Sequence, residues 1–273
     1  QNKLPPDDIV NMDEVSMSFD IAPARSVATM GSKNVTITTT GHERTHFTIV
    51  LACTASGIKL KPMVIFKRVT MPREQFPAGV VVEVNKKVWM NAEVMKSWTD
   101  KCLRTRRGAF FNRKALLIMD SMTSHKEEGV QRYLNSTGAH IAIIPGGLTC
   151  KLQPLDVAVN HPFKSYIREE WSKWMVDGKH TFTPSGRQRR ADYTEVCRWV
   201  LSAWQRVQTS TIVSGFQKCG ITESNDSSSS EEEGDNIDDR YQDIIDMLAK
   251  TDSDTSFNGF EEHSDVDNTG NDD

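Results

Sequence analysis

Near the start of the chain, apolar and β-branched residues are grouped as they are in β-strands. A short apolar run over residues 8–13 ends at the acidic pair Asp13 and Glu14. Three further runs, separated by turns that contain glycine, span residues 34–40, 45–55 and 60–67. Runs of this composition joined by short turns predict an antiparallel meander.

The pattern then changes to one in which helices and strands alternate. Residues 91–106 begin with an asparagine suited to an N-cap and predict a helix. An apolar strand is expected at 115–119, an amphipathic helix at 126–136 and a second strand at 140–144. This order predicts a right-handed parallel crossover. We therefore expect an α/β domain with a mixed five-stranded sheet, antiparallel strands first and parallel strands after, flanked by helices.

Two more helices are expected, over residues 157–176 and 194–206, because tryptophan and aliphatic residues recur there at helical spacing. A stripe of this kind favours core packing over a platform on which bases stack. The loop between the two helices carries Arg187, Arg189 and Arg190, which we expect to contact phosphate groups.

The net charge of −4 conceals an uneven distribution. From Glu223 onward there are 18 acidic residues and two basic ones, which leaves 19 acidic and 31 basic residues in positions 1–222. The first part therefore carries +12 and the second −16. A basic core of this kind favours a polyanionic partner such as DNA.

The acidic part also differs in composition. It is rich in Ser, Asp and Glu and has few apolar residues, so burial cannot offset the entropy lost on ordering. We expect a folded domain over residues 1–222 and an acidic disordered tail over residues 223–273. Only residues 241–248 have the pattern of a short amphipathic helix, formed on meeting a protein partner.

Several classes of protein are disfavoured. No apolar run approaches the ~18 residues of a membrane span, so we expect no membrane partner. The five cysteines are widely spaced and form no CxxC pair, which argues against a disulfide framework and a zinc ribbon.

Three aspartates stand where this topology brings chain segments together. Asp13 is expected at the end of the first strand, Asp120 at the end of the fourth, and Asp156 at the start of the helix after the fifth. Clustered carboxylates select hard cations such as Mg²⁺, and two such ions support phosphodiester displacement. We expect the three carboxylates to lie about 4–7 Å apart, as a two-metal site requires. The alternative, for each aspartate alone, is that it caps a helix or turn.

Two other groupings resemble catalytic motifs. Residues 42–46 match the HExxH pattern of zinc proteases, which needs a helix to bring its histidines to one metal. Strand-like residues on both sides predict instead that His42 and His46 lie on an extended segment and share no metal. Ser121 and His125 suggest a nucleophile and base, but no glycine pattern for an oxyanion hole accompanies them. We expect His125 to orient groups near Asp120.

Three blocks of sequence comprise residues 11–14, residues 116–121 with His125, and residues 152–156 with Phe163 and Lys164. They resemble the DDE-type domain of pogo/Tigger transposases, a branch of the mariner superfamily that includes domesticated host proteins. Residues 41–49, 60–67 and 216–221 are also similar, so the resemblance covers roughly residues 8–222. Two positions depart from the family's pattern: Val15 stands where Thr is frequent, and Ser121 where Asn is frequent.

The resemblance implies a ribonuclease H-like fold in which Asp13, Asp120 and Asp156 are catalytic and bind two Mg²⁺ or Mn²⁺ ions. It implies DNA as partner and a nuclear location. Two hypotheses remain open: an active DNA endonuclease and strand-transfer core, or a domesticated, non-cleaving DNA-binding or chromatin-associated protein. A homo-oligomer and a protein partner for the tail also remain open.

Overall fold

The computed structural model describes residues 4–22, 30, 38–109 and 114–223. Within them the chain forms six strands, seven α-helices and three short helical segments of other types. In chain order the elements are η1 (Pro6–Asp8), β1 (Ile9–Ser18), β2 (His46–Thr54), β3 (Met63–Lys67), β4 (Val81–Asn85), α1 (Ala92–Trp98), η2 (Thr99–Leu103), β5 (Ala115–Met119), α2 (Thr123–Lys126), α3 (Glu128–Ser136), β6 (Ala139–Ile143), α4 (Thr149–Leu152), η3 (Leu155–Val159), α5 (Asn160–Asp177), α6 (Tyr193–Arg206) and α7 (Thr209–Lys218).

The six strands form one mixed sheet in the order β4-β3-β2-β1-β5-β6. The pairs β1–β2 and β2–β3 are antiparallel, whereas β3–β4, β1–β5 and β5–β6 are parallel. The predicted mixed sheet, with an antiparallel meander followed by parallel strands, is confirmed. The sheet has one strand more than the five expected, because β4 pairs with β3 and forms the edge of the sheet.

Strand β1 is longer than its sequence suggested, which changes the placement of Asp13. It pairs with β2 from Val10 to Ser18, and Asp13 lies opposite Leu51 in the middle of that ladder. The expectation that Asp13 ends the strand is therefore wrong. The reason is that β2 supplies hydrogen-bond partners well past this point, whereas the parallel pairing with β5 stops at Asn11.

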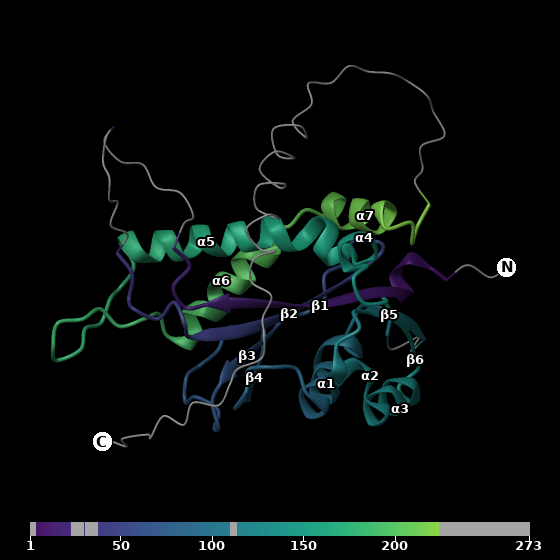
Figure 1. The fold of residues 1–273 in the computed structure, drawn as a ribbon, viewed down its shortest axis with the longest axis horizontal. Coiled ribbons are helices and arrows are strands. Elements are labelled where there is room, and N and C mark those ends of the chain that lie inside the picture. Colours follow the sequence, from purple (N-terminus) through teal and green to yellow (C-terminus); the bar gives the residue numbers. More distant parts are fainter. Residues whose placement is uncertain (1–3, 23–29, 31–37, 110–113, 224–273) are drawn as a thin grey trace. The chain divides into compact units, whose positions relative to one another are not determined.

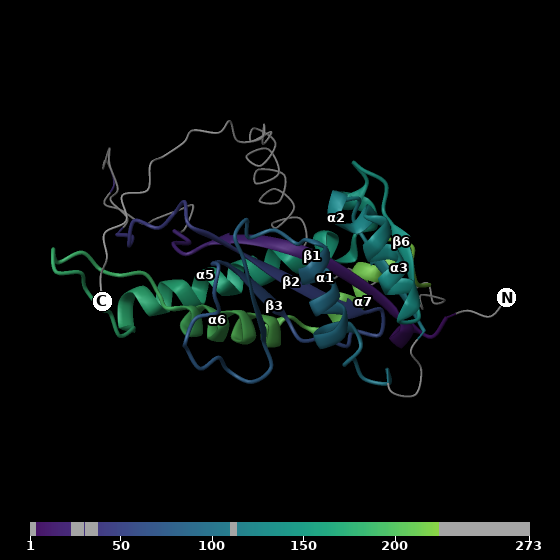
Figure 2. The ribbon, with the colours of Figure 1, turned by 90° about the horizontal axis from the view of Figure 1, so that it is seen from below.

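Helices cover both faces of the sheet, and each face has its own core (Figures 1 and 2). Alternate residues of β1 point to opposite faces, as a strand requires. Val15 belongs to the core beneath α5, α6 and α7, and Met12 to the core beneath α1 and α3. The tryptophan stripes of α5 and α6 are core residues, as predicted: Trp171, Trp199 and Trp204 are all buried.

The predicted helices are present with adjusted bounds. Asn91 caps α1 as expected, because its side-chain Oδ1 accepts a hydrogen bond from the backbone N–H of Val94 at 2.9 Å. The helix then widens into the π-helical segment η2. The same kind of segment, η3, precedes α5, so that Asp156 lies in a π-helical turn at the entrance to the longest helix described.

Some expectations concern residues that the structure does not describe. Residues 34–37 of the run predicted at 34–40 lie outside the described ranges, and residues 38–40 are not in a strand. Residues 224–273, nearly all of the predicted acidic tail, also lie outside them. Among the described residues, no helix combines the length and the apolar character needed to cross a membrane.

Candidate active site

Asp13 and Asp156 are brought together by a buried asparagine. Asn160, in the first turn of α5, donates from Nδ2 to Asp13 Oδ2 at 2.6 Å and to Asp156 Oδ1 at 2.8 Å. Asp156 precedes Asn160 by one helical turn, and Asp13 reaches the same nitrogen from β1. Two of the three predicted carboxylates therefore converge on a single amide.

Burial and the neighbouring carboxylate of Asp156 change the acidity of Asp13. Burial of its side chain is the largest cause, and repulsion from Asp156 adds to it, so the pKa of Asp13 rises from 3.8 to about 7. The hydrogen bond from Asn160 acts in the opposite sense, because it stabilises the ionised form. Near neutral pH, this pair therefore carries less negative charge than two separate carboxylates would.

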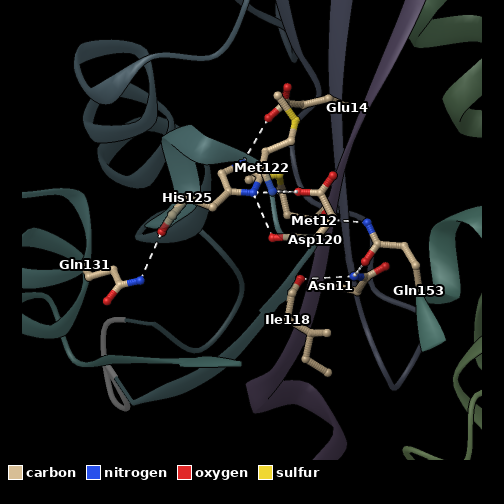
Figure 3. Close-up of polar contacts among 9 residues, drawn as sticks. All are labelled: Asn11, Met12, Glu14, Ile118, Asp120, Met122, His125, Gln131 and Gln153. Atoms are coloured by element: carbon tan, nitrogen blue, oxygen red, sulfur yellow. Dashed lines mark hydrogen bonds and ion pairs between the residues drawn. The ribbon is translucent and has the colours of Figure 1, made fainter. Parts of the chain in front are cut away.

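Asp120 directly follows β5, the strand beside β1, and it contacts His125 of α2 (Figure 3). The Nδ1 atom of His125 is 2.8 Å from Asp120 Oδ1, and its Nε2 atom is 3.1 Å from Glu14 Oε1. The backbone N–H of Met122 also donates to Asp120 Oδ1 at 3.1 Å. The expectation that His125 orients groups near Asp120 is confirmed by these contacts.

Charge pairing dominates the acidity of this second group. Burial alone would raise the pKa of Asp120, but hydrogen bonds from His125 and Met122 outweigh it, so that pKa lies below its ordinary value. Burial would likewise lower the pKa of His125, yet the contacts with Asp120 and Glu14 raise it from 6.5 to about 9. His125 is therefore a cation near neutral pH, held between two carboxylates.

Both groups follow the last pair of the parallel ladder between β1 and β5. Asn11 pairs with Ile118 there, and each lies two residues before an aspartate, Asp13 within β1 and Asp120 just past the end of β5. Paired strands lie ~4.8 Å apart, so the two aspartates follow neighbouring backbone segments. Among the residues that the structure describes, however, no three His, Cys, Asp or Glu side chains are arranged so that they could hold a metal ion together.

The chemistry of these residues fits a divalent cation. Carboxylate and amide oxygens are the ligands that Mg²⁺ and Mn²⁺ prefer. Burial, and then repulsion from Asp156, raises the pKa of Asp13, so a nearby positive charge would favour its ionised form. The Oδ1 atom of Asn160, buried beside the two carboxylates, has no hydrogen-bond partner. A cation between Asp13 and Asp156 would relieve the repulsion that contributes to the raised pKa.

The HExxH-like segment is not helical. The backbone N–H of Thr45 donates to the carbonyl of His42 at 3.1 Å, which closes a turn, and β2 begins at His46. The prediction of an extended segment is wrong for this turn, which forms because Asp20 accepts hydrogen bonds from the backbone N–H groups of Thr40 and His42. The helix that the protease motif needs is missing here.

The arginine-rich loop is only partly available to a phosphate. Arg187 and Arg189 are exposed, whereas the guanidinium of Arg190 is stacked on the rings of Phe19 and Tyr193, 3.9 and 4.5 Å from their centroids. Arg190 therefore stabilises the fold at this end of the sheet.

Sequence reasoning missed the amides that hold the site together. Asn160 carried no signal of its own, although its position four residues after Asp156 on a helix places both on one face. Asn11 and Gln153 were also overlooked, and both are fully buried. A polar residue inside an apolar strand, as Asn11 is, was the available hint, because buried amides require partners.

The mixed sheet and these acidic groups fit the expectation of a protein of the DDE type, and comparison with known proteins shows that family. Residues 44–216 match the family model of the DDE superfamily endonucleases. The chain belongs to this family. Asp120 and Asp156 lie within the matched range, and Asp13 precedes it.

Similarity to pogo-type proteins confirms the resemblance seen in the sequence. The chain is 32% identical over 225 residues to the human "Pogo transposable element with KRAB domain". That alignment covers 82% of this chain and 36% of the human protein, so the chain spans about a third of the length of this relative.

Solved structures support the ribonuclease H-like fold. A Mos1 transposase paired-end complex with the left transposon end has a TM-score of 0.53 at 12% identity, covering 78% of this chain and 52% of that one. The Mos1 mariner paired-end complex with Mn has a TM-score of 0.51 at 14% identity, covering 80% and 54%. At these identities the likeness concerns the fold.

Proposed function

We propose that this chain is the metal-dependent core of a DNA-cleaving and strand-transferring protein, in which Asp13, Asp120 and Asp156 bind two Mg²⁺ or Mn²⁺ ions. The observation that carries the proposal is the meeting of Asp13 and Asp156 at Asn160, with a raised pKa for Asp13. Membership of the DDE superfamily endonucleases and the Mn-containing Mos1 complex support it.

Each acidic group has a distinct part in this proposal. Asp13 and Asp156 supply oxygen ligands that Asn160 keeps side by side before a cation arrives. Asp120, directly after β5, supplies the third ligand, and His125 fixes its carboxylate by one hydrogen bond while contacting Glu14 with its other nitrogen. Two ions held by these residues would supply activation of the attacking oxygen and stabilisation of the leaving oxygen of a phosphodiester.

The class of substrate is inferred from the charge of residues 1–222 and from similarity to a known transposase. Residues 1–222 carry +12, and Arg187 and Arg189 are exposed on one loop, which suits a phosphate backbone. The structurally similar Mos1 transposase forms a paired-end complex with a transposon end. We infer a DNA substrate, a nuclear location and, by the same kinship, assembly of more than one copy on DNA.

A second candidate is a chain that keeps the fold and binds DNA without cutting it. Two observations favour it: Asp120 Oδ1 contacts both His125 and the N–H of Met122, and the described residues contain no ready-made group of three metal ligands. A domesticated, chromatin-associated protein would need only the basic surface.

Nicking of supercoiled plasmid DNA in Mn²⁺ or Mg²⁺ separates the two candidates. For an active enzyme, we expect nicking by the wild type and background levels for Asp120→Asn and Asp156→Asn. His46→Gln, a change at an exposed residue of the HExxH-like segment, is the matched control and should nick normally. Nicking that survives both aspartate changes together would refute the assignment, and a wild type without divalent-dependent nicking would favour the binding protein.

A further inference from the structure

Two buried amide side chains lie next to the candidate site, and neither touches solvent. Asn11 on β1 and Gln153, just before η3, both have no exposed surface. Figure 3 shows them side by side, with Asn11 between the strand that leads to Asp120 and the segment that leads to Asp156. Buried amides of this kind are retained only where they are fully hydrogen-bonded.

The hydrogen bonds of this pair join three separate parts of the chain. Asn11 Nδ2 donates to the carbonyl oxygen of Ile118 at 3.0 Å and to Gln153 Oε1 at 3.2 Å. Asn11 Oδ1 accepts from the backbone N–H of Leu155 at 3.0 Å. Gln153 Nε2 in turn donates to the carbonyl oxygen of Met12 at 3.4 Å. Asn11 thus uses both of its donors and its acceptor oxygen.

Each anchoring point lies one or two residues before a carboxylate of the site. Asn11 and Ile118 each lie two residues before an aspartate, Asp13 and Asp120 respectively, and Leu155 immediately precedes Asp156. A single side chain therefore holds the backbones that carry all three acidic residues.

The local backbone explains why an amide is needed there. The parallel ladder between β1 and β5 ends at the pair of Asn11 and Ile118, so no further strand pairing fixes the distance between them. The N–H of Leu155 lies in the first turn of η3 and has no partner within its own helix. The side chain of Asn11 donates a hydrogen bond to the carbonyl oxygen of Ile118 and accepts one from the N–H of Leu155. Because the amide is neutral, it adds no charge beside the carboxylates.

We propose that Asn11 and Gln153 form a positioning pair that sets the spacing of Asp13, Asp120 and Asp156 and thereby the affinity for divalent metal. This inference rests on the metal site put forward above. Groups that orient metal ligands from behind change metal affinity by about 10- to 100-fold when they are replaced. A merely structural role would lower stability and leave the affinity of the folded protein unchanged.

The test compares Mn²⁺ affinity, measured by isothermal titration calorimetry, with the thermal midpoint measured without metal. Gln153→Met keeps the size of the side chain and removes its two hydrogen bonds, and Asn11→Leu removes all three bonds of Asn11. Leu134→Ala is the control, because Leu134 is a fully buried core residue of α3 on the face of the sheet away from α5, α6 and α7.

We expect Gln153→Met to bind Mn²⁺ about 10- to 100-fold more weakly than the wild type. Leu134→Ala should lose at least as much thermal stability and bind Mn²⁺ like the wild type. If Asn11→Leu does not fold, the milder Gln153→Met still decides the question. Wild-type affinity in Gln153→Met, or equal weakening in Leu134→Ala, would overturn the positioning role alone. A wild type that binds no Mn²⁺ would overturn the metal site and this inference with it.

Discussion

At the scale of single residues, the acidic side chains of the site fall into two groups that differ in their charge near neutral pH. Burial, and then repulsion from Asp156, raises the pKa of Asp13, so that its protonation is favoured up to about pH 7. Asp120 instead contacts His125, whose proton is retained up to about pH 9. Added positive charge would therefore stabilise the ionised form of Asp13 beside Asp156, whereas Asp120 already contacts the His125 cation.

The protonation of His125 should contribute to stability in a defined pH window. Its pKa is about 9 in the folded protein and 6.5 when unperturbed, so the folded state binds the proton more tightly. The stabilisation is complete below pH 6.5 and is lost as the pH rises to 9, at most about 3 kcal/mol. Urea denaturation from pH 6 to 9.5 should show a steeper decline for the wild type than for His125→Gln. Parallel curves would contradict the ion pairs.

Asp13 should show the same sign over a lower range. Its folded-state pKa of about 7 lies above the unperturbed 3.8, so the wild type loses stability from this group as the pH rises from 4 to 7. Asp13→Asn removes the charge and should stabilise the metal-free protein at pH 8 by on the order of 1–4 kcal/mol, with little effect at pH 4. Denaturation at both pH values measures this. A destabilised variant at pH 8 would mean that the carboxylate is not crowded.

At the scale of elements, periodicity was enough to predict the strands and helices with long apolar patterns. Periodicity predicted the strands β2, β3, β5 and β6, and it predicted the bounds of the helices α3, α5 and α6 within a few residues. It missed β4, a five-residue edge strand that pairs in parallel with β3. A parallel pair is joined by a long connection, so the sequence contains no hairpin-turn signal before β4. It also missed α7, whose interior Gly215 is an unfavourable helix residue.

The candidate site was predictable only in part. The three aspartates stood out because each is close to an apolar run in the sequence. The contacts of Asn160 and Asn11, by contrast, depend on how η3 and α5 pack against β1, and residue spacing along the chain does not contain that information. The same limitation explains the wrong placement of Asp13 at a strand end, because the length of β1 is set by its partner β2.

The packing of α7 against η3 explains Gly215 and leads to a prediction. A Cβ atom added there would lie 3.0 Å from the carbonyl oxygen of Pro154 and 3.1 Å from Ala158 Cβ, and each of these residues is two positions from Asp156 in the sequence. Alanine favours a helix by up to ~1 kcal/mol over glycine, but crowding of a packed interface costs about 1–3 kcal/mol. We expect Gly215→Ala to lower the free energy of unfolding by about 1 kcal/mol and to weaken Mn²⁺ binding.

A second glycine provides the control for that experiment. Gly129 in α3 has no atom within 4 Å of its added Cβ, so Gly129→Ala should be neutral or stabilising by a few tenths of a kcal/mol. Urea denaturation of both variants separates crowding from helix propensity. If Gly215→Ala is stabilised as much as Gly129→Ala, the close approach of α7 to η3 does not constrain the site.

At the scale of the whole molecule, charge is divided between two stretches of sequence. Residues 1–222 carry +12 and residues 223–273 carry −16, and the described fold lies almost entirely within the first. Clustered basic residues bind DNA largely by releasing counterions from phosphates, and an attached polyanion of similar charge competes for the same surface. The acidic stretch is thus a candidate for self-inhibition of the DNA binding proposed above.

Removal of residues 223–273 tests this idea together with the proposed domain boundary. The stretch has too few apolar residues to add to a core, so its deletion should change the thermal midpoint little. Affinity for duplex DNA, measured by fluorescence anisotropy, should increase on truncation, and more at 50 mM than at 200 mM salt, because screening weakens the competition between the two charged stretches. A control chain with the acidic residues of this stretch changed to Asn and Gln keeps its length and should behave like the truncated one. Equal affinity with and without residues 223–273 at both salt concentrations would exclude self-inhibition, and a drop of several degrees in the midpoint would move the domain boundary beyond residue 222.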